Sequence, residues 1–242
     1  IFFGVAFALP FLAGVPMGFG YSQRLDVSIF GLAQMFYPAA GAMLAGLLTR
    51  GGDALIPRRF FVGYLIITAM MLICSLGSVL APLMPWNTAS NSVMVLGSVA
   101  AWILLLTEKE HKRIAYGLHG GAWKATALIV LLYIVLLLIR AVILYHLSDG
   151  SNPLAALAQN AGITLSLIIN FFLSFTAFLG EEYGWRYYLQ PILQKKLGLV
   201  RGVLVLGVLW GLWHWPVGLF YYSIPSAALT IIAVYLVTCV TL

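Results

Sequence analysis

Charged side chains are scarce in this chain: only 8% of its 242 residues are Asp, Glu, Lys or Arg, whereas 62% are hydrophobic. The mean hydropathy of +1.02, with apolar runs near the twenty residues that cross a bilayer core of about 30 Å, excludes an ordinary soluble domain. Cysteine is scarce too, and Cys74 and Cys239 both fall within apolar runs. Neither a disulfide framework nor a cysteine-based metal site is therefore predicted.

The apolar runs divide the chain into candidate membrane helices. Eight runs approach the required length, at 1–20, 28–48, 60–81, 91–107, 125–147, 163–180, 202–222 and 226–242. The predicted fold class is all-α, a polytopic transmembrane bundle of about eight helices. Pro10, Gly14 and Pro16 are expected to interrupt the first helix. We expect one membrane domain, with N-terminal helices in 1–160 and the functional helices in 161–242.

The net charge of +6 arises from basic residues in short loops, which predicts membrane orientation and no nucleic-acid partner. Two stretches, 82–90 and 148–162, contain no Lys or Arg, and Arg24 is the one exception to the alternation. We expect a cytoplasmic N-terminus and cytoplasmic loops that carry three basic groups: Arg50, Arg58 and Arg59; Lys109, Lys112, Arg113 and Lys124; and Arg186, Lys195, Lys196 and Arg201.

Ionisable residues next to or within apolar runs are the first functional candidates, because each costs roughly 2.5 kcal/mol or more in the bilayer core. Glu181 and Glu182 follow one apolar run, Arg186 comes four residues after the second acid, and His214 lies inside a later run. Helical periodicity turns Glu182 towards Arg186, a spacing that suits an ion pair. The orientation of the loops places this cluster towards the cytoplasmic side.

Helical periodicity also predicts a polar face around Glu181. If the sixth helix continues through Gly180, Asn170, Ser174 and Glu181 fall within about 40° of one another and should face the bundle interior. An alternative stays open at this point. The acids and the arginine could instead mark a helix end at the membrane interface, where nearby aromatic residues would form a belt: Tyr183, Trp185, Tyr187 and Tyr188.

The seventh predicted helix places His214 on a face of small residues. Glycines at 207, 211 and 218 share this face, which predicts close packing against another helix. Trp210 lies one turn before His214, and Pro216 is expected to kink the helix just after it. A lone histidine of this kind is more often a packing residue than a catalyst, and the inward carboxylate of Glu181 is what favours a functional role.

Two motifs resemble those of a known family. Glu181 to Arg186 reads E-E-x-x-x-R, and Trp210 to His214 reads aromatic-x-x-x-His. From about Leu167 to Leu242 the chain resembles the CPBP family of intramembrane proteases. This family groups the Ras-converting type of CAAX prenyl endopeptidase with bacteriocin-processing and bacteriocin-immunity (Abi) proteins.

The resemblance implies that Glu181 and His214 together activate water for attack on a peptide carbonyl, with Glu182, Arg186 and Trp210 in support. A carboxylate in a low-dielectric cavity is expected to have a raised pKa, which suits a proton acceptor. The resemblance further implies an integral protein of a bacterial plasma membrane. Its partners would be membrane lipid and a membrane-associated peptide or protein.

One element of the family pattern is absent, because no H-x-x-x-N or H-x-x-x-D motif follows His214. Because the given sequence ends at Leu242 within an apolar run, the expectation is a sequence truncated before a final helix. A protein without that motif would lack an oxyanion donor, whose loss costs about a hundredfold to a thousandfold in rate. Asn170 is a weaker substitute. Catalytic zinc usually takes three protein ligands, and this chain offers Glu181 and His214, so we expect no cofactor and a metal-free glutamate mechanism, with a zinc mechanism as the less favoured alternative.

Two other functions share these residues. A proton-coupled secondary transporter could use Glu181, Asn170 and Ser174 as a relay, although no first-half counterpart of the acidic motif indicates internal symmetry. A catalytically inactive, protease-like scaffold or immunity protein would keep the fold without the chemistry. The missing final motif is the feature that supports this third hypothesis.

Overall fold

The computed structural model describes residues 1–120, 122–147 and 169–222, together with 166, 230, 233, 234 and 237. Every regular element within them is helical, which confirms the predicted all-α class. In chain order the elements are a π-helix η1 (Gly4–Ala8), α1 (Leu9–Ser22), α2 (Ser28–Gln34), α3 (Tyr37–Thr49), α4 (Arg58–Leu80), α5 (Trp86–Thr107), α6 (Glu110–Ala115), α7 (Trp123–Leu147), α9 (Phe175–Glu182), a π-helix η2 (Tyr183–Leu189), α10 (Gln190–Leu197), α11 (Leu199–Trp213), α12 (Trp215–Val217) and a π-helix η3 (Gly218–Tyr222).

Membrane spans agree with the hydropathy pattern wherever the structure describes them. Four segments are long and apolar enough to cross a bilayer. The segment made of α11 with α12 and η3 is bent by 41°, and it is either a broken fifth span or a re-entrant loop. The first four are Gly4–Ser22, Ser28–Thr49, Arg58–Leu80 and Trp86–Thr107. The chain is therefore an integral membrane protein with a helical bundle. The predicted 125–147 helix is α7. Residues 163–165, 167 and 168 of the predicted 163–180 helix, most of 226–242, and the division at 160 lie outside the described residues.

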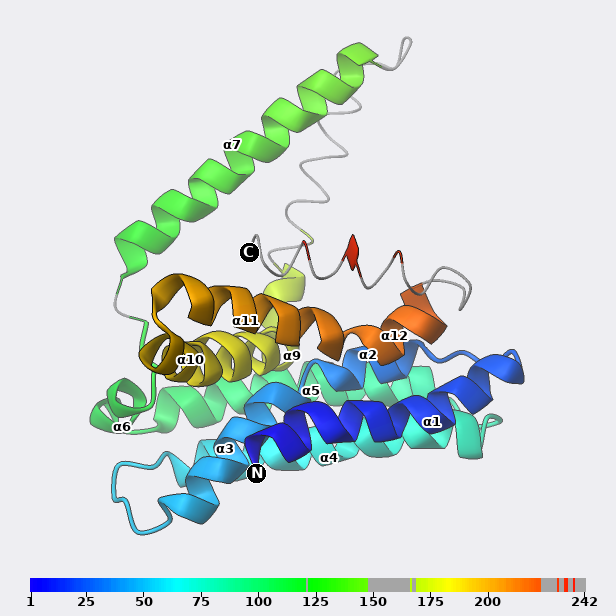
Figure 1. Ribbon diagram of the computed structural model, residues 1–242, viewed down its shortest axis with the longest axis horizontal. Helices are drawn as coiled ribbons and strands as arrows, with labels where there is room; N and C mark the ends of the chain where they lie inside the picture. Colours follow the sequence, from blue (N-terminus) through cyan, green and yellow to red (C-terminus); the bar gives the residue numbers. More distant parts are fainter. Residues whose placement is uncertain are drawn as a thin grey trace.

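Figure 1 shows long helices α1, α4 and α5 running along the bundle, with α10 and α11 as an adjacent pair and α7 leading away from them. The core is rich in aromatic residues that are almost inaccessible to solvent, including Phe36, Tyr37, Phe60, Phe61 and Tyr64. These side chains lie where α3 and α4 meet α9 and η2. The packed interior is therefore centred beside the acidic motif.

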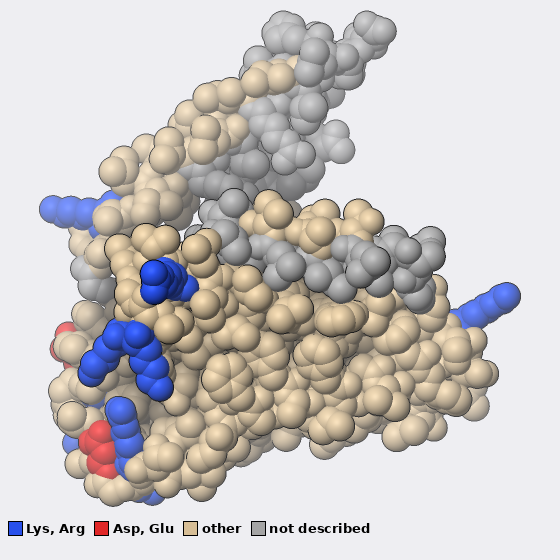
Figure 2. All heavy atoms as spheres, in the orientation of Figure 1, with Lys and Arg blue, Asp and Glu red and all other residues tan. Residues whose placement is uncertain are grey.

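Hydrogen bonds join loops at each of the two ends of the bundle. At one end the α3–α4 loop contacts the region around α6, because the Tyr116 hydroxyl donates to Asp53 at 2.8 Å and Lys112 donates to the carbonyl of Ile56 at 3.4 Å. At the other end Asn87 donates to Asp26 at 2.9 Å. In Figure 2 most Lys and Arg side chains gather at one end of the molecule.

Two of the predicted helices are broken within the bilayer segment. The run at 28–48 is divided into α2 and α3, since Pro38 has no N–H to donate to the carbonyl of Gln34. The run at 202–222 bends at His214, two residues before Pro216, as predicted. The expected interruption of the first helix takes the form of η1 ahead of Pro10, while Pro16 is accommodated inside α1.

Candidate active site

A helical hairpin brings the acidic motif and His214 to the same level of the bundle. The turn is at Gly198, whose φ of 85° is a left-handed conformation that favours glycine. Glu181 lies 17 residues before this turn and His214 lies 16 residues after it. At about 1.5 Å of rise per residue, both are about 25 Å along their helices from the turn.

Trp210 contacts both candidate catalytic residues. Its indole N–H donates to Oε2 of Glu181 at 3.2 Å. Its backbone carbonyl lies 2.9 Å from Nδ1 of His214. Because a carbonyl can only accept, Nδ1 carries the hydrogen and Nε2 is the ring nitrogen with the lone pair in the neutral form. One residue thus joins a carboxylate to an imidazole in the base-competent tautomer.

Glu182 and Arg186 form the ion pair that helical spacing predicted. The guanidinium donates to Oε2 of Glu182 at 2.8 Å, and both side chains are substantially exposed. An exposed pair of this kind contributes only about 0.3–0.5 kcal/mol. Arg186 also lies over the ring of Trp210, with the guanidinium carbon 5.2 Å from the ring centroid. Its position therefore also supports the indole that contacts Glu181.

Three tryptophans pack together beside Glu181 and His214. Trp185 stacks on Trp210 with ring centroids 6.1 Å apart, and it meets Trp213 edge-on at 5.6 Å. Trp185 and Trp213 are almost completely buried. The aromatic-belt alternative is consequently wrong for Trp185, and equally for Tyr183, which is 4% exposed. Sequence analysis missed Trp185 and Trp213 as site residues, although both lie inside the two motifs.

Two glycines let the acidic helix approach α2 and α3 closely. A Cβ added to Gly180 would overlap the carbonyl oxygen of Met35, and one added to Gly184 would overlap Pro38, backbone included. These glycines bracket the two glutamates at a spacing of four residues, which is the small-x-x-x-small pattern of close helix contacts in membranes. Sequence analysis missed them, and that spacing was the available signal.

The structure does not bring Asn170, Ser174 and Glu181 together on one polar face. The helix is interrupted at Ser174, whose φ of −112° departs from helical geometry, so the phase extrapolated from Asn170 to Glu181 is not kept. Asn170 is exposed, and within the described residues no hydrogen bond joins Asn170 or Ser174 to Glu181. The continuous-helix prediction that placed these three together is therefore wrong.

Thr176 supplies the buried polar contacts on this helix instead. Its hydroxyl lies 2.9 Å from the hydroxyl of Ser98 on α5, and its carbonyl accepts from the Tyr64 hydroxyl on α4 at 2.8 Å. Its backbone N–H also donates to Ser98 at 3.2 Å. These bonds fix the first turn of α9, and so the direction in which Glu181 leaves it.

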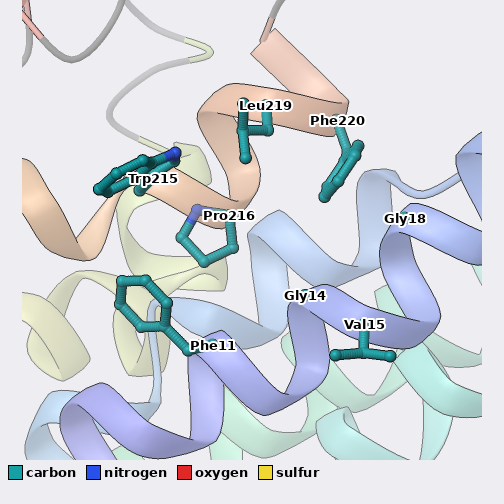
Figure 3. A pocket seen from close by; sticks show the side chains of 8 residues that line it. All are labelled: Phe11, Gly14, Val15, Gly18, Trp215, Pro216, Leu219 and Phe220. Carbon is teal, nitrogen blue, oxygen red and sulfur yellow. The ribbon is translucent and has the colours of Figure 1, made fainter. Parts of the chain in front are cut away.

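The glycine face of the seventh predicted helix is buried, as expected. Gly207, Gly211 and Gly218 are all inaccessible, while His214 itself is partly buried. Just beyond His214, α12 and η3 lie against α1 and enclose an apolar groove of about 460 Å³. Figure 3 shows the residues that line it: Phe11, Gly14, Val15, Gly18, Trp215, Pro216, Leu219 and Phe220.

A catalytic zinc site usually needs three protein ligands. No group of three or more His, Cys, Asp or Glu side chains comes together among the described residues. Glu181 and His214 are two donors, and Glu182 is paired with Arg186 instead. The described residues therefore do not assemble a three-ligand zinc site.

Comparison with known proteins identifies the segment that carries these residues. Residues 162–241, about a third of the chain, match the model of a family described as type II CAAX prenyl endopeptidase Rce1-like. No curated protein and no solved structure matches the chain. The matched range includes Glu181, Arg186, Trp210 and His214. The segment from 162 to 241 is thus an Rce1-like segment, and the CPBP-family resemblance inferred from the two motifs is confirmed.

Proposed function

We propose that this protein is an intramembrane endopeptidase in which Glu181 activates water and His214 assists. The observation that carries the proposal is the pair of bonds through Trp210, which hold a carboxylate and an imidazole together inside an Rce1-like segment of a membrane protein. A carboxylate and a neutral imidazole are groups that general acid–base catalysis uses.

The reaction would proceed by addition of water and loss of an amine. Glu181 accepts a proton from water as the water oxygen forms a bond to the scissile carbonyl carbon, and the carbonyl oxygen takes up the negative charge. His214 orients the water through Nε2. The proton then passes to the leaving nitrogen as the C–N bond breaks, which releases a carboxylate and an amine. General acid–base catalysis of this kind contributes about 10²–10⁴-fold in rate.

The substrate would be a peptide attached to or inserted in the membrane. The apolar groove begins at Trp215, the residue after His214, and its wall at Val15 is 73% exposed. Such a groove suits the apolar part of a membrane-associated substrate, with the peptide bond directed towards Glu181. The end of the bundle that carries the basic side chains in Figure 2 is assigned to the cytoplasm by the positive-inside rule.

The transporter alternative has less support than the protease. Its relay required Asn170 and Ser174 beside Glu181, whereas Asn170 is exposed and Ser174 lies at a helix break. The remaining alternative, an inactive scaffold or immunity protein, would have the same fold as the protease but would not cleave peptides. It is therefore distinguished by an activity measurement.

The test uses an internally quenched peptide with a farnesylated CAAX terminus, and its unprenylated counterpart, on the protein in liposomes. We expect Glu181→Gln and His214→Ala each to lower kcat by about 10²–10⁴-fold. Glu182→Gln should lower kcat less than tenfold, since it removes only an exposed pair. Glu110→Gln, on the exposed surface of α6, is the matched control and should leave kcat unchanged.

Each component of the proposal has its own contrary result. Wild-type kcat in folded Glu181→Gln would exclude the carboxylate as the base. Loss of activity with a chelator would exclude the metal-free mechanism. A folded wild-type protein that cleaves neither peptide would favour the scaffold.

A further inference from the structure

The break between α2 and α3 abuts the backbone beside both candidate catalytic residues. Gly180, the residue before Glu181, packs against the carbonyl of Met35. Trp213, the residue before His214, has its carbonyl bonded by the side-chain amide of Gln34 at 2.8 Å. Gln34 and Met35 are consecutive, and they contact the residue before His214 and the residue before Glu181, respectively.

Gln34 is a costly residue at this position unless its amide is bonded. It is 4% exposed and ends α2 within an otherwise apolar span. A buried amide without a partner costs about 1–3 kcal/mol or more. The bond to Trp213 satisfies the amide N–H and at the same time fixes the carbonyl where α11 ends and the 41° bend begins.

The contact between Gly180 and Met35 leaves no space for α9 to move towards α2. Gly180 has no space for even a Cβ against Met35, and Gly184 has none against Pro38. The bond from Gln34 therefore ties His214 to the same backbone against which the Glu181 helix is pressed. Both contacts thus meet at the junction of α2 and α3.

On the basis of the proposed function, we infer that Gln34 is a positioning residue that sets the separation of Glu181 and His214 by holding the carbonyl of Trp213. Its effect is exerted through His214, because Trp213 precedes His214 and the two rings are in edge-on contact at 4.8 Å. Misplacement of a reacting group by about 1 Å can lower a rate by about a hundredfold.

The test is Gln34→Met, which keeps the length of the side chain and removes the N–H donor. With the farnesylated quenched peptide in liposomes, we expect kcat to fall by about 10- to 100-fold while KM stays within about twofold. In a His214→Ala background the same substitution should cause no further loss in residual kcat. Gln23→Met makes the same chemical change at an exposed residue after α1 and should leave kcat unchanged.

Several results would overturn the inference. A folded Gln34→Met with kcat within twofold of wild type would do so, and so would an equal loss of kcat in the wild-type and His214→Ala backgrounds. If Gln34→Met does not fold, Gln34→Asn replaces it, since its amide is one methylene too short to reach Trp213. Wild-type kcat in that variant, or failure of both variants to fold, would make Gln34 a structural residue only. Retention of activity in Glu181→Gln would instead refute the proposed function, independently of Gln34.

Discussion

Two pairs of packed helices in this bundle behave differently. The helices α4 and α5 are continuous over more than twenty residues each and contact one another through side chains. The pair formed by α9 with η2 against α2 with α3 is broken on both sides and makes contact through backbone. Side-chain contacts can adjust when a neighbour changes, whereas backbone contacts cannot. The second pair is therefore the rigid one, and it carries Glu181.

The difference between the two pairs of helices is tested most directly by a Gly→Ala substitution in each pair, which adds one methyl group at a helix contact. We expect Gly184→Ala to lower the free energy of unfolding by about 3 kcal/mol, because its Cβ would overlap the Pro38 backbone. Gly63→Ala on α4 is the control, since its Cβ would meet only the end of the Leu104 side chain. Equilibrium unfolding in mixed micelles measures both. Equal losses for the two variants would contradict the distinction between backbone and side-chain contact.

A smaller effect is expected from the hydroxyl bond that joins the two pairs. Thr176→Val removes the hydroxyl contact to Ser98 between α9 and α5 and keeps the backbone N–H bond to Ser98, so it should destabilise the protein by about 1 kcal/mol. A double-mutant cycle with Ser98→Ala should return a coupling of similar size. Ser92→Ala, at an exposed hydroxyl on α5, should change the free energy of unfolding by less than about 0.5 kcal/mol. Absence of coupling between positions 98 and 176 would leave α9 without this polar tie to α5.

The smallest effect is expected at the end of the bundle where both pairs finish. Asp53 accepts bonds from the N–H of Leu55 and from the Tyr116 hydroxyl, each at 2.8 Å, and these bonds lower the pKa of its carboxyl. Because the pKa of this carboxyl is lower in the folded than in the unfolded protein, its ionised form stabilises the fold at pH values above about 3.9, the pKa of a free Asp. That stabilisation is lost as the pH falls through the lowered pKa of the folded state.

The measurement is the unfolding temperature from pH 7 down to pH 2, compared between wild type and Asp53→Asn. We expect the difference between the two proteins to be largest at neutral pH and to shrink in acid below about pH 3.9. A constant difference across this range would show that the carboxylate charge is not the origin of the stabilisation. The effect should be small because the site is exposed to solvent.

Hydropathy was sufficient to predict the long elements of the fold and insufficient for the breaks. Spans such as α4 and α5 were located within about five residues, since a membrane helix needs a fixed number of apolar residues. The α2/α3 break was missed because Gln34 and Pro38 interrupt the apolar run too briefly to change its mean. The helix break at Ser174 was missed because the helical periodicity of about 100° per residue was extrapolated from Asn170 to Glu181 as if the helix were continuous.

The sequence singled out the ionisable candidates of the site and Trp210, but not the glycines and the other tryptophans that pack around them. Glu181, His214 and the pair of Glu182 with Arg186 stand out from sequence because charge is costly among apolar residues. Gly180, Gly184 and Trp185 act through close contact, and such contact depends on which helices become neighbours. The four-residue spacing of the two glycines indicates a close helix contact, but it does not say which helix makes that contact.

The two bonds at Trp210 differ in how a substitution can affect them. The bond to Glu181 uses the indole N–H, whereas the bond to His214 uses the main-chain carbonyl that every amino acid possesses. A scan of side chains at position 210 therefore changes the bond to the carboxylate and the ring contacts with Trp185 and Arg186, but not the bond to the imidazole. Any residue at position 210 that keeps the helix also keeps the carbonyl that binds the imidazole. Substitutions there would therefore not reveal this bond, and sequence change at that position does not remove it.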